Sequence, residues 1–195
     1  SIPVTLGRDN YGGGTRYFEG YLADVRIVIG SAQYTSAFTV PTESLTAITN
    51  TQLLAAQLPW LGDKSTNAHA ITHYGNVSIE PFRPYKYEPW NSTDFIGSVY
   101  VPGSDQLEVS DHLTVADFGA NNFTIEGWFW SDNTTQQYQF FFSGRGSSTY
   151  RLRVQYTDIA CTTVHCGQAD IQSPTAGTAL SPQDTGTRRY SSPQS

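Results

Sequence analysis

The residues with the clearest chemical potential are one carboxylate and two tryptophans at alternate positions, Glu126, Trp128 and Trp130. Alternate residues of an extended strand point to the same side of a sheet, so these three side chains are expected to share a face. Flat aromatic rings pack against the C–H faces of sugars, and a carboxylate accepts hydrogen bonds from sugar hydroxyls. The pattern predicts a glycan-binding face. The alternative is that a second sheet or a neighbouring subunit covers both tryptophans.

Patterns typical of catalysis are missing from the sequence. Glycoside hydrolysis requires two carboxylates about 5 to 9.5 Å apart, whereas Glu126 stands alone on its expected strand and Asp132 lies beyond the end of that strand. The histidines show neither metal-ligand spacing nor the context of a Ser-His-Asp triad. They are His69, His73, His112 and His165. We therefore expect that the protein is not an enzyme.

The two cysteines, Cys161 and Cys166, form a Cys-x4-Cys pair with His165 beside the second. Two thiols and one imidazole are too few ligands for a closed zinc site. An oxidising compartment would allow a local disulfide between them. Otherwise they are two unpaired thiols in a loop, and both interpretations remain open.

Composition and charge argue against several classes of protein. Charged residues make up 14% of the 195 residues, against about 25% in an average globular domain. The net charge of −6 argues against nucleic-acid binding, because phosphate contacts need a basic surface. No apolar run is long enough to span a membrane, and residues 1–6 show no features of a signal peptide. Because the chain begins at Ser1, we expect a processed protein or a piece of a longer one.

The elements that would position the candidate residues are strands. Residues 21–29 alternate in character, which predicts one face made of Tyr21, Ala23, Val25, Ile27 and Ile29 and the other of Leu22, Asp24, Arg26 and Val28. Further short strands are expected at 98–101, 106–109, 123–130, 138–142 and 150–156. Many short strands separated by Gly, Asn and Asp turns are typical of an all-β sandwich or jelly roll.

Two stretches of the sequence together resemble a known family. One comprises residues 18–27 (FEGYLADVRI), followed by AQY at 32–34 and FTVPT at 38–42. The other comprises residues 97–109 (GSVYVPGSDQLEV), followed by NFTIEGW at 122–128. They resemble the closing and opening segments of concanavalin A-like, laminin-G-like jelly rolls, in particular the tandem repeats of tailed-phage tail and fibre proteins. The resemblance extends over about residues 6–156 and implies an antiparallel jelly-roll sandwich.

The resemblance also implies a division of the chain, in which the closing segment precedes the opening one. Residues 1–43 would be the C-terminal segment of one repeat, 44–93 a linker with the first strands of the next, and 94–158 the N-terminal half of that second repeat. Residues 159–195 form a polar Ser/Thr/Pro tail that we expect to be disordered or extended. A sandwich from these parts would be either permuted or completed by a neighbouring subunit.

The function that this resemblance implies is that of a viral structural or interaction protein in a tail, fibre or surface appendage. It would mediate assembly and host-surface attachment in a virion or extracellular setting. The expected partners are other copies of the chain or virion proteins and host surface polysaccharide, with no nucleic acid and no membrane span. A glycan-binding, lectin-like module is the alternative, and a glycosidase is the weakest reading.

A metal site follows only from the resemblance, because many laminin-G-like domains bind Ca²⁺ at the rim of the sandwich. The candidate ligands here are Asp105, Asp111 and Asp117, which lie near predicted loops and supply the hard oxygen atoms that Ca²⁺ prefers. Aspartates in such positions also form turns, which is the alternative. No other cofactor is expected.

Overall fold

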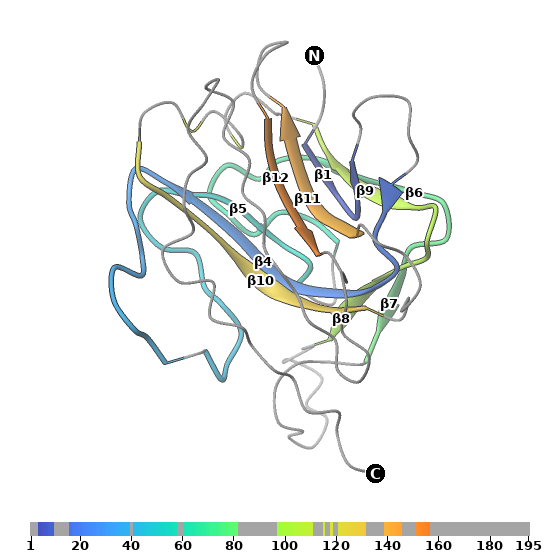
Figure 1. Ribbon diagram of the computed structural model, residues 1–195, viewed down its shortest axis with the longest axis horizontal. Helices are drawn as coiled ribbons and strands as arrows, with labels where there is room; N and C mark the ends of the chain where they lie inside the picture. The colour runs from blue at the N-terminus through green and yellow to red at the C-terminus, as the bar shows by residue number, and fades with distance from the viewer. Residues whose placement is uncertain are drawn as a thin grey trace.

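The computed structural model describes residues 4–9, 16–39, 41–57, 61–81, 97–110, 115, 118, 121–131, 139–145 and 151–156 (Figure 1). The strands within these residues are β1 (Val4–Leu6), β2 (Arg8–Asp9), β3 (Arg16–Tyr17), β4 (Gly20–Ile29), β5 (Thr51–Ala55), β6 (Ile71–Tyr74), β7 (Ser78–Glu80), β8 (Ser98–Val101), β9 (Gln106–Val109), β10 (Phe123–Ser131), β11 (Gln139–Arg145) and β12 (Arg151–Tyr156). Every pairing among them is antiparallel. The predicted all-β class is therefore confirmed.

Two five-stranded sheets make up most of the described structure, with a small β2–β3 ribbon beside them. The first, which we call the β1 sheet, has the order β12-β11-β1-β9-β6. The second, the β4 sheet, has the order β10-β4-β8-β7, and β5 also pairs with β4. Strand β4 has β10 along one edge, whereas β8 and β5 share its other edge end to end. This central position gives β4 most of the sheet's pairing.

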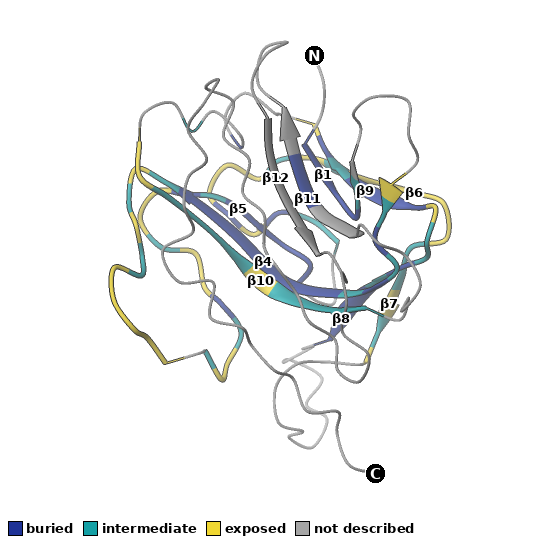
Figure 2. Cartoon of the chain, in the orientation of Figure 1, coloured by how far each residue is buried: buried dark blue, intermediate teal, exposed yellow. Residues whose placement is uncertain are grey.

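The two sheets pack face to face around one hydrophobic core (Figure 2). Each sheet supplies alternate apolar residues to it, as the period of a strand requires. From the β1 sheet come Val4, Leu6, Leu107, Val109 and Phe142, and from the β4 sheet come Leu22, Val25, Ile27, Leu53, Ala55, Val99 and Val101. Phe18, which lies two residues before β4, is fully buried among them. Its ring and that of Phe129 form a T-shaped contact with their centroids 6.4 Å apart.

A β-bulge in β4 corrects the predicted faces of that strand. Arg26 pairs with Glu126 and Ala23 pairs with Trp128, so two residues of β4 lie opposite the single residue Gly127. Asp24 is the extra residue, and its φ of 52° lies in the left-handed region. Such an insertion shifts the alternation of side chains by one position.

Because of the bulge, side chains in the N-terminal part of β4 lie on the opposite face of the sheet from the one predicted. Leu22, not Tyr21, belongs with Val25 and Ile27 in the core. Tyr21 pairs with Trp130 and Ala23 with Trp128, so both lie on the outer face of the β4 sheet. The prediction that placed Tyr21 and Ala23 with Val25 was wrong, because it assumed an uninterrupted period of two.

Most of the other predicted strands are found with bounds within one or two residues. Strands β8 and β9 match the predictions, and β10 extends the predicted 123–130 by one residue. Sequence reasoning did not predict β1 or β7, whose three residues each are too few for a period. The predicted polar tail, 159–195, lies outside the described residues.

Candidate functional site

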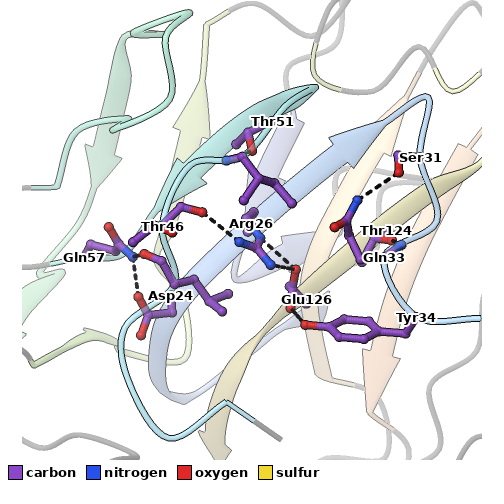
Figure 3. Close-up of polar contacts among 12 residues, drawn as sticks. Asp24, Arg26, Ser31, Gln33, Tyr34, Thr46, Thr51, Gln57, Thr124 and Glu126 are labelled. Atoms are coloured by element: carbon purple, nitrogen blue, oxygen red, sulfur yellow. Dashed lines mark hydrogen bonds and ion pairs between the residues drawn. The ribbon is translucent and has the colours of Figure 1, made fainter. Parts of the chain in front are cut away.

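Glu126 occupies the middle of β10 on the outer face of the β4 sheet, directly opposite Arg26 of β4. The guanidinium donates from Nε to Glu126 Oε1 at 2.7 Å, and Nη2 lies 2.6 Å from the same oxygen (Figure 3). The side chains of Arg26 and Glu126 are only 8% and 13% exposed. Because their charges cancel at close range and the guanidinium is a multiple donor, this is a strong cross-strand pair.

The second oxygen of Glu126 is also engaged. The Tyr34 hydroxyl donates to Glu126 Oε2 at 2.5 Å, and the Tyr34 ring stacks on Phe38 with centroids 4.0 Å apart. Burial raises the pKa of the Tyr34 hydroxyl above its usual 10.0, and the neighbouring Glu126 carboxylate raises it further. Close by, the backbone N–H of Gln33 donates to Thr124 Oγ1 at 2.9 Å. These contacts fasten the segment after β4 onto β10.

The segment between β4 and β5 is tied to the outer face at further points (Figure 3). Arg26 Nη1 donates to the backbone oxygen of Thr46 at 2.7 Å. The amide of Gln57 donates to the Asp24 carboxylate and to the backbone oxygen of Leu45. Residues 31–39 and 41–50 therefore cover the Arg26 end of the outer face, which explains why Arg26 and Val28 are buried there. We call this segment, which lies between β4 and β5, the outer-face loop.

The contacts with Arg26 and Tyr34 give Glu126 a structural role. Both of its oxygens accept hydrogen bonds from side chains of this chain, and little of the carboxylate reaches solvent. Direct contact of Glu126 with a sugar stays a prediction, and such contact would have to replace Arg26 or Tyr34. Arg26 and Tyr34 were not predicted as partners, because only the pairing of β4 with β10 brings them to Glu126.

The two tryptophans of the predicted glycan-binding face lie on the outer face beyond the outer-face loop. Trp128 pairs with Ala23, and Trp130 pairs with Tyr21. Tyr21 pairs in turn with Tyr100 of β8, with ring centroids 4.9 Å apart. Tyr100, Tyr21 and Trp130 thus form one row across β8, β4 and β10, which we call the aromatic row. All three residues and Trp128 are partly exposed.

The tyrosines of the aromatic row are residues that sequence reasoning missed. The period of two had grouped Tyr21 with Val25 and Ile27, and Tyr100 carried no pattern that linked it to the tryptophans. A signal was available in Asp24, because aspartate is depleted in strands and tolerates the left-handed conformation that this bulge residue adopts. With the bulge in place, the predicted pair of tryptophans becomes part of a larger aromatic surface.

Asp105, a predicted Ca²⁺ ligand, is 7% exposed and organises a turn. Its carboxylate accepts from the backbone N–H of Asn76 at 2.6 Å and from Ser104 Oγ at 3.3 Å. Gly75 has a φ of +80° and so little room that a Cβ would lie 1.9 Å from Asp105 Oδ1. Turn formation was the alternative weighed for this aspartate, and these contacts support it.

The other predicted metal and disulfide residues lie outside the described residues: Asp111, Asp117, Cys161 and Cys166. Within the part of the chain that the structure describes, no three His, Cys, Asp or Glu side chains are grouped so as to hold a metal ion. The Ca²⁺ site and the disulfide stay predictions.

A buried carboxylate that sequence reasoning did not single out is Asp63. Its Oδ1 accepts from the backbone N–H groups of Leu54 at 2.9 Å and Ser65 at 2.8 Å. Its Oδ2 accepts from Ser65 Oγ at 2.7 Å and from the backbone N–H of His69 at 3.0 Å. Asp63 therefore fixes the turn after β5 and has no remaining chemistry to offer a ligand.

Fold and site together define an all-β protein of two packed antiparallel sheets, with a carboxylate–arginine–tyrosine junction and an aromatic row on one outer face. Comparison with known proteins finds no matching family model, no matching curated protein and no matching solved structure. Among the described residues, no helix has the length and apolar character needed to cross a membrane.

Proposed function

We propose that this chain is a structural and attachment module of a viral tail, fibre or surface appendage, built as a permuted jelly-roll sandwich from laminin-G-like repeat segments. The observation that supports this function is the junction at Glu126. Arg26 and Tyr34, from the stretch that resembles a closing segment, bind Glu126 in the stretch that resembles an opening segment. The two stretches therefore belong to one folded unit.

Such a junction suits a load-bearing appendage. If consecutive repeats meet inside a sheet, rather than through an exposed linker, their relative orientation is fixed by strand pairing and a shared core. In this chain β4 supplies the shared strand, between β10 on one edge and β8 on the other. The role requires binding and rigidity but no catalysis, and it fits a virion or extracellular location with other copies or virion proteins as partners.

The test is to ask whether the chain is a component of virus particles. Mass spectrometry of purified particles should detect its peptides, and antibodies raised against the purified full chain should label a tail, fibre or surface projection in electron micrographs. The purified chain should also compete with particles for adsorption to susceptible cells. Absence of its peptides from particles, with the protein found as a separate secreted monomer, would contradict the proposal.

A glycan-binding, lectin-like module is a second candidate, favoured by one observation. Trp128 and Trp130 lie on the outer face of the β4 sheet, and Tyr21 extends them towards β8. Aromatic surfaces of this kind bind the apolar faces of sugars. The two functions are compatible, because attachment to a host surface is one use of glycan binding. A glycan array of the purified chain separates a lectin-like module from a purely structural one.

A further inference from the structure

We propose that residues 31–39, which we call the strap, open away from β10 as one unit while both sheets stay folded, and that this motion uncovers the Glu126 carboxylate. The strap is the first part of the outer-face loop. Tyr34 is its latch, whereas Arg26 stays on Glu126 in the closed and the open state. The motion belongs to the fold itself and does not depend on the proposed viral function.

The strap is joined to β10 by hydrogen bonds from two adjacent residues. The backbone N–H of Gln33 donates to Thr124 Oγ1 at 2.9 Å, and the Tyr34 hydroxyl donates to Glu126 Oε2 at 2.5 Å (Figure 3). The Tyr34 ring stacks on Phe38, which is itself part of the strap. Because both hydrogen bonds come from the same end of the strap, one motion can break them together.

The burial and the backbone of the strap favour local opening. None of residues 31–39 is buried, and residues 35–39 are all exposed (Figure 2). None of these residues lies in a strand, so no ladder of backbone hydrogen bonds holds them. Segments with little buried apolar surface and an exposed backbone open at a lower free energy than the whole domain unfolds.

The later part of the outer-face loop is fixed more firmly. Leu45 is buried, and its backbone oxygen accepts a hydrogen bond from the Gln57 side chain. The backbone oxygen of Thr46 accepts from Arg26 Nη1 at 2.7 Å. These contacts attach residues 45 and 46 to β4 and to the segment after β5. The strap can therefore move while this part of the loop keeps its place.

The start of the strap is fixed as well. Just before it, the backbone N–H of Gly30 donates to the backbone oxygen of Asn122 at 2.7 Å, which ties the end of β4 to the residue before β10. Gly30 has a φ of +100°, in a region that glycine adopts without strain. The chain thus has a fixed point with a flexible residue type at the position where the strap begins.

Opening would change the surroundings of Glu126 without breaking its ion pair. Arg26 contacts Oε1, whereas Tyr34 contacts Oε2, so loss of Tyr34 frees one oxygen only. Separating Arg26 from Glu126 would instead leave two nearly buried charges unpaired, which is far more costly. Of the two partners, Tyr34 is the one that leaves. The strap is therefore a gate over the second oxygen of Glu126.

Hydrogen exchange of the full chain, resolved at single amides by NMR, tests the motion. The Gln33 amide reports on the strap, and the Asp24 amide, which donates to the backbone oxygen of Ala56 at 3.1 Å, reports on the β4 sheet. Low concentrations of urea should speed exchange at Asp24 but not at Gln33, because a local opening exposes little surface. Tyr34→Phe should speed exchange at Gln33 by about tenfold or more.

Two further variants separate opening of the strap from unfolding of the sheets. Thr35→Ala alters an exposed strap residue beside the latch and should leave exchange at Gln33 within about twofold of its original rate. Ile27→Val removes a buried methylene group from the core and should speed exchange at Asp24 by about fivefold without affecting Gln33. Since the urea series needs no substitution, the test holds even if a variant fails to fold.

Carboxyl labelling measures whether the motion uncovers Glu126. Carbodiimide coupling of an amine to Glu126, quantified by mass spectrometry, should be faster in Tyr34→Phe by about the same factor as exchange at Gln33. Glu43, which is exposed on the outer-face loop, is the internal reference, and its labelling should not change.

Three outcomes would overturn the inference. They are exchange at Gln33 that rises with urea as steeply as at Asp24, exchange at Gln33 that Tyr34→Phe leaves unchanged, and labelling of Glu126 that is equal in the unaltered chain and in Tyr34→Phe. None of these measurements involves virus particles, so the inference and the proposed function fail separately.

Discussion

Arg26 of β4 and Glu126 of β10 are cross-strand neighbours and ion-pair partners, although 100 residues separate them in the chain. Their contact joins the two stretches of sequence that carry the family resemblance. It also positions the outer-face loop, because Arg26 reaches Thr46 and Glu126 reaches Tyr34. One ion pair therefore links strand pairing with the cover of the outer face.

Removing one partner of this pair should destabilise the protein strongly. Arg26→Met or Glu126→Leu leaves the other charge nearly buried without its counter-charge, which costs about 3 kcal/mol in the free energy of unfolding. Urea unfolding followed by tryptophan fluorescence measures the loss. The double variant Arg26→Met/Glu126→Leu should lose less than the sum of the two, because no unpaired charge remains. Strictly additive losses would contradict the pairing.

Tyr34 gives the stability a dependence on alkaline pH. Its pKa is raised above 10.0 in the folded chain, chiefly by burial and then by Glu126. The folded protein thus holds this proton more tightly than the unfolded chain does. The resulting stabilisation is constant below the unfolded pKa and is lost as pH rises through the folded pKa.

The check on Tyr34 compares the unaltered chain with Tyr34→Phe between pH 7 and pH 11.5. At pH 7 the variant should lose about 1.5 to 3 kcal/mol, the value of one hydrogen bond to a charged group. Above pH 10 the difference between the two proteins should shrink. A difference that stays constant or widens over this range would show that the pKa of Tyr34 is not raised in the folded protein.

Gly20 allows β4 to approach β10 closely at the start of the strand. Its φ is +148°, and a Cβ there would lie 1.9 Å from the backbone oxygen of Trp130. Gly20→Ala should therefore lower the free energy of unfolding by more than about 1 kcal/mol. Thermal unfolding measures this, with Ala68→Gly as a control, because Ala68 has a φ of 48° that glycine adopts without strain. The control should not lose stability.

Asp63 should be needed for the turn after β5. Asp63→Ala removes an acceptor that serves three backbone N–H groups and one hydroxyl, and we expect a loss of about 3 kcal/mol. Thr66→Ala, at an exposed position in the same turn, should change stability by less than about 0.5 kcal/mol. Chemical denaturation of the two variants side by side tests the prediction, and similar values for both would refute it.

The sequence could predict strands wherever alternation extended over at least four residues, as in β8, β9 and β10. It could not predict the faces of β4 across Asp24, because the bulge depends on which strand pairs with β4 and in what register. Strand β1 was missed although it lies between β11 and β9, since three buried residues carry no period.

The candidate site was predictable only in part. The spacing of Trp128 and Trp130 placed both on one face, and the register agrees with that placement. The partners of Glu126 could not be predicted, because Tyr34 follows β4 and reaches β10 only through the tertiary fold. Tyr100 required the pairing of β4 with β8, which no local pattern contains.

The central place of β4 also has a consequence for synthesis on the ribosome. Residues 20–29 emerge well before their main partner, which ends at Ser131, and Glu126 is synthesised 100 residues after Arg26. At about 5–20 residues per second this interval is roughly 5–20 s. For most of that time this ten-residue, mainly apolar strand has neither β8 nor β10 beside it, because β8 begins only at Ser98. Nascent β4 is therefore the segment where we expect chaperone binding and, when translation stalls, aggregation.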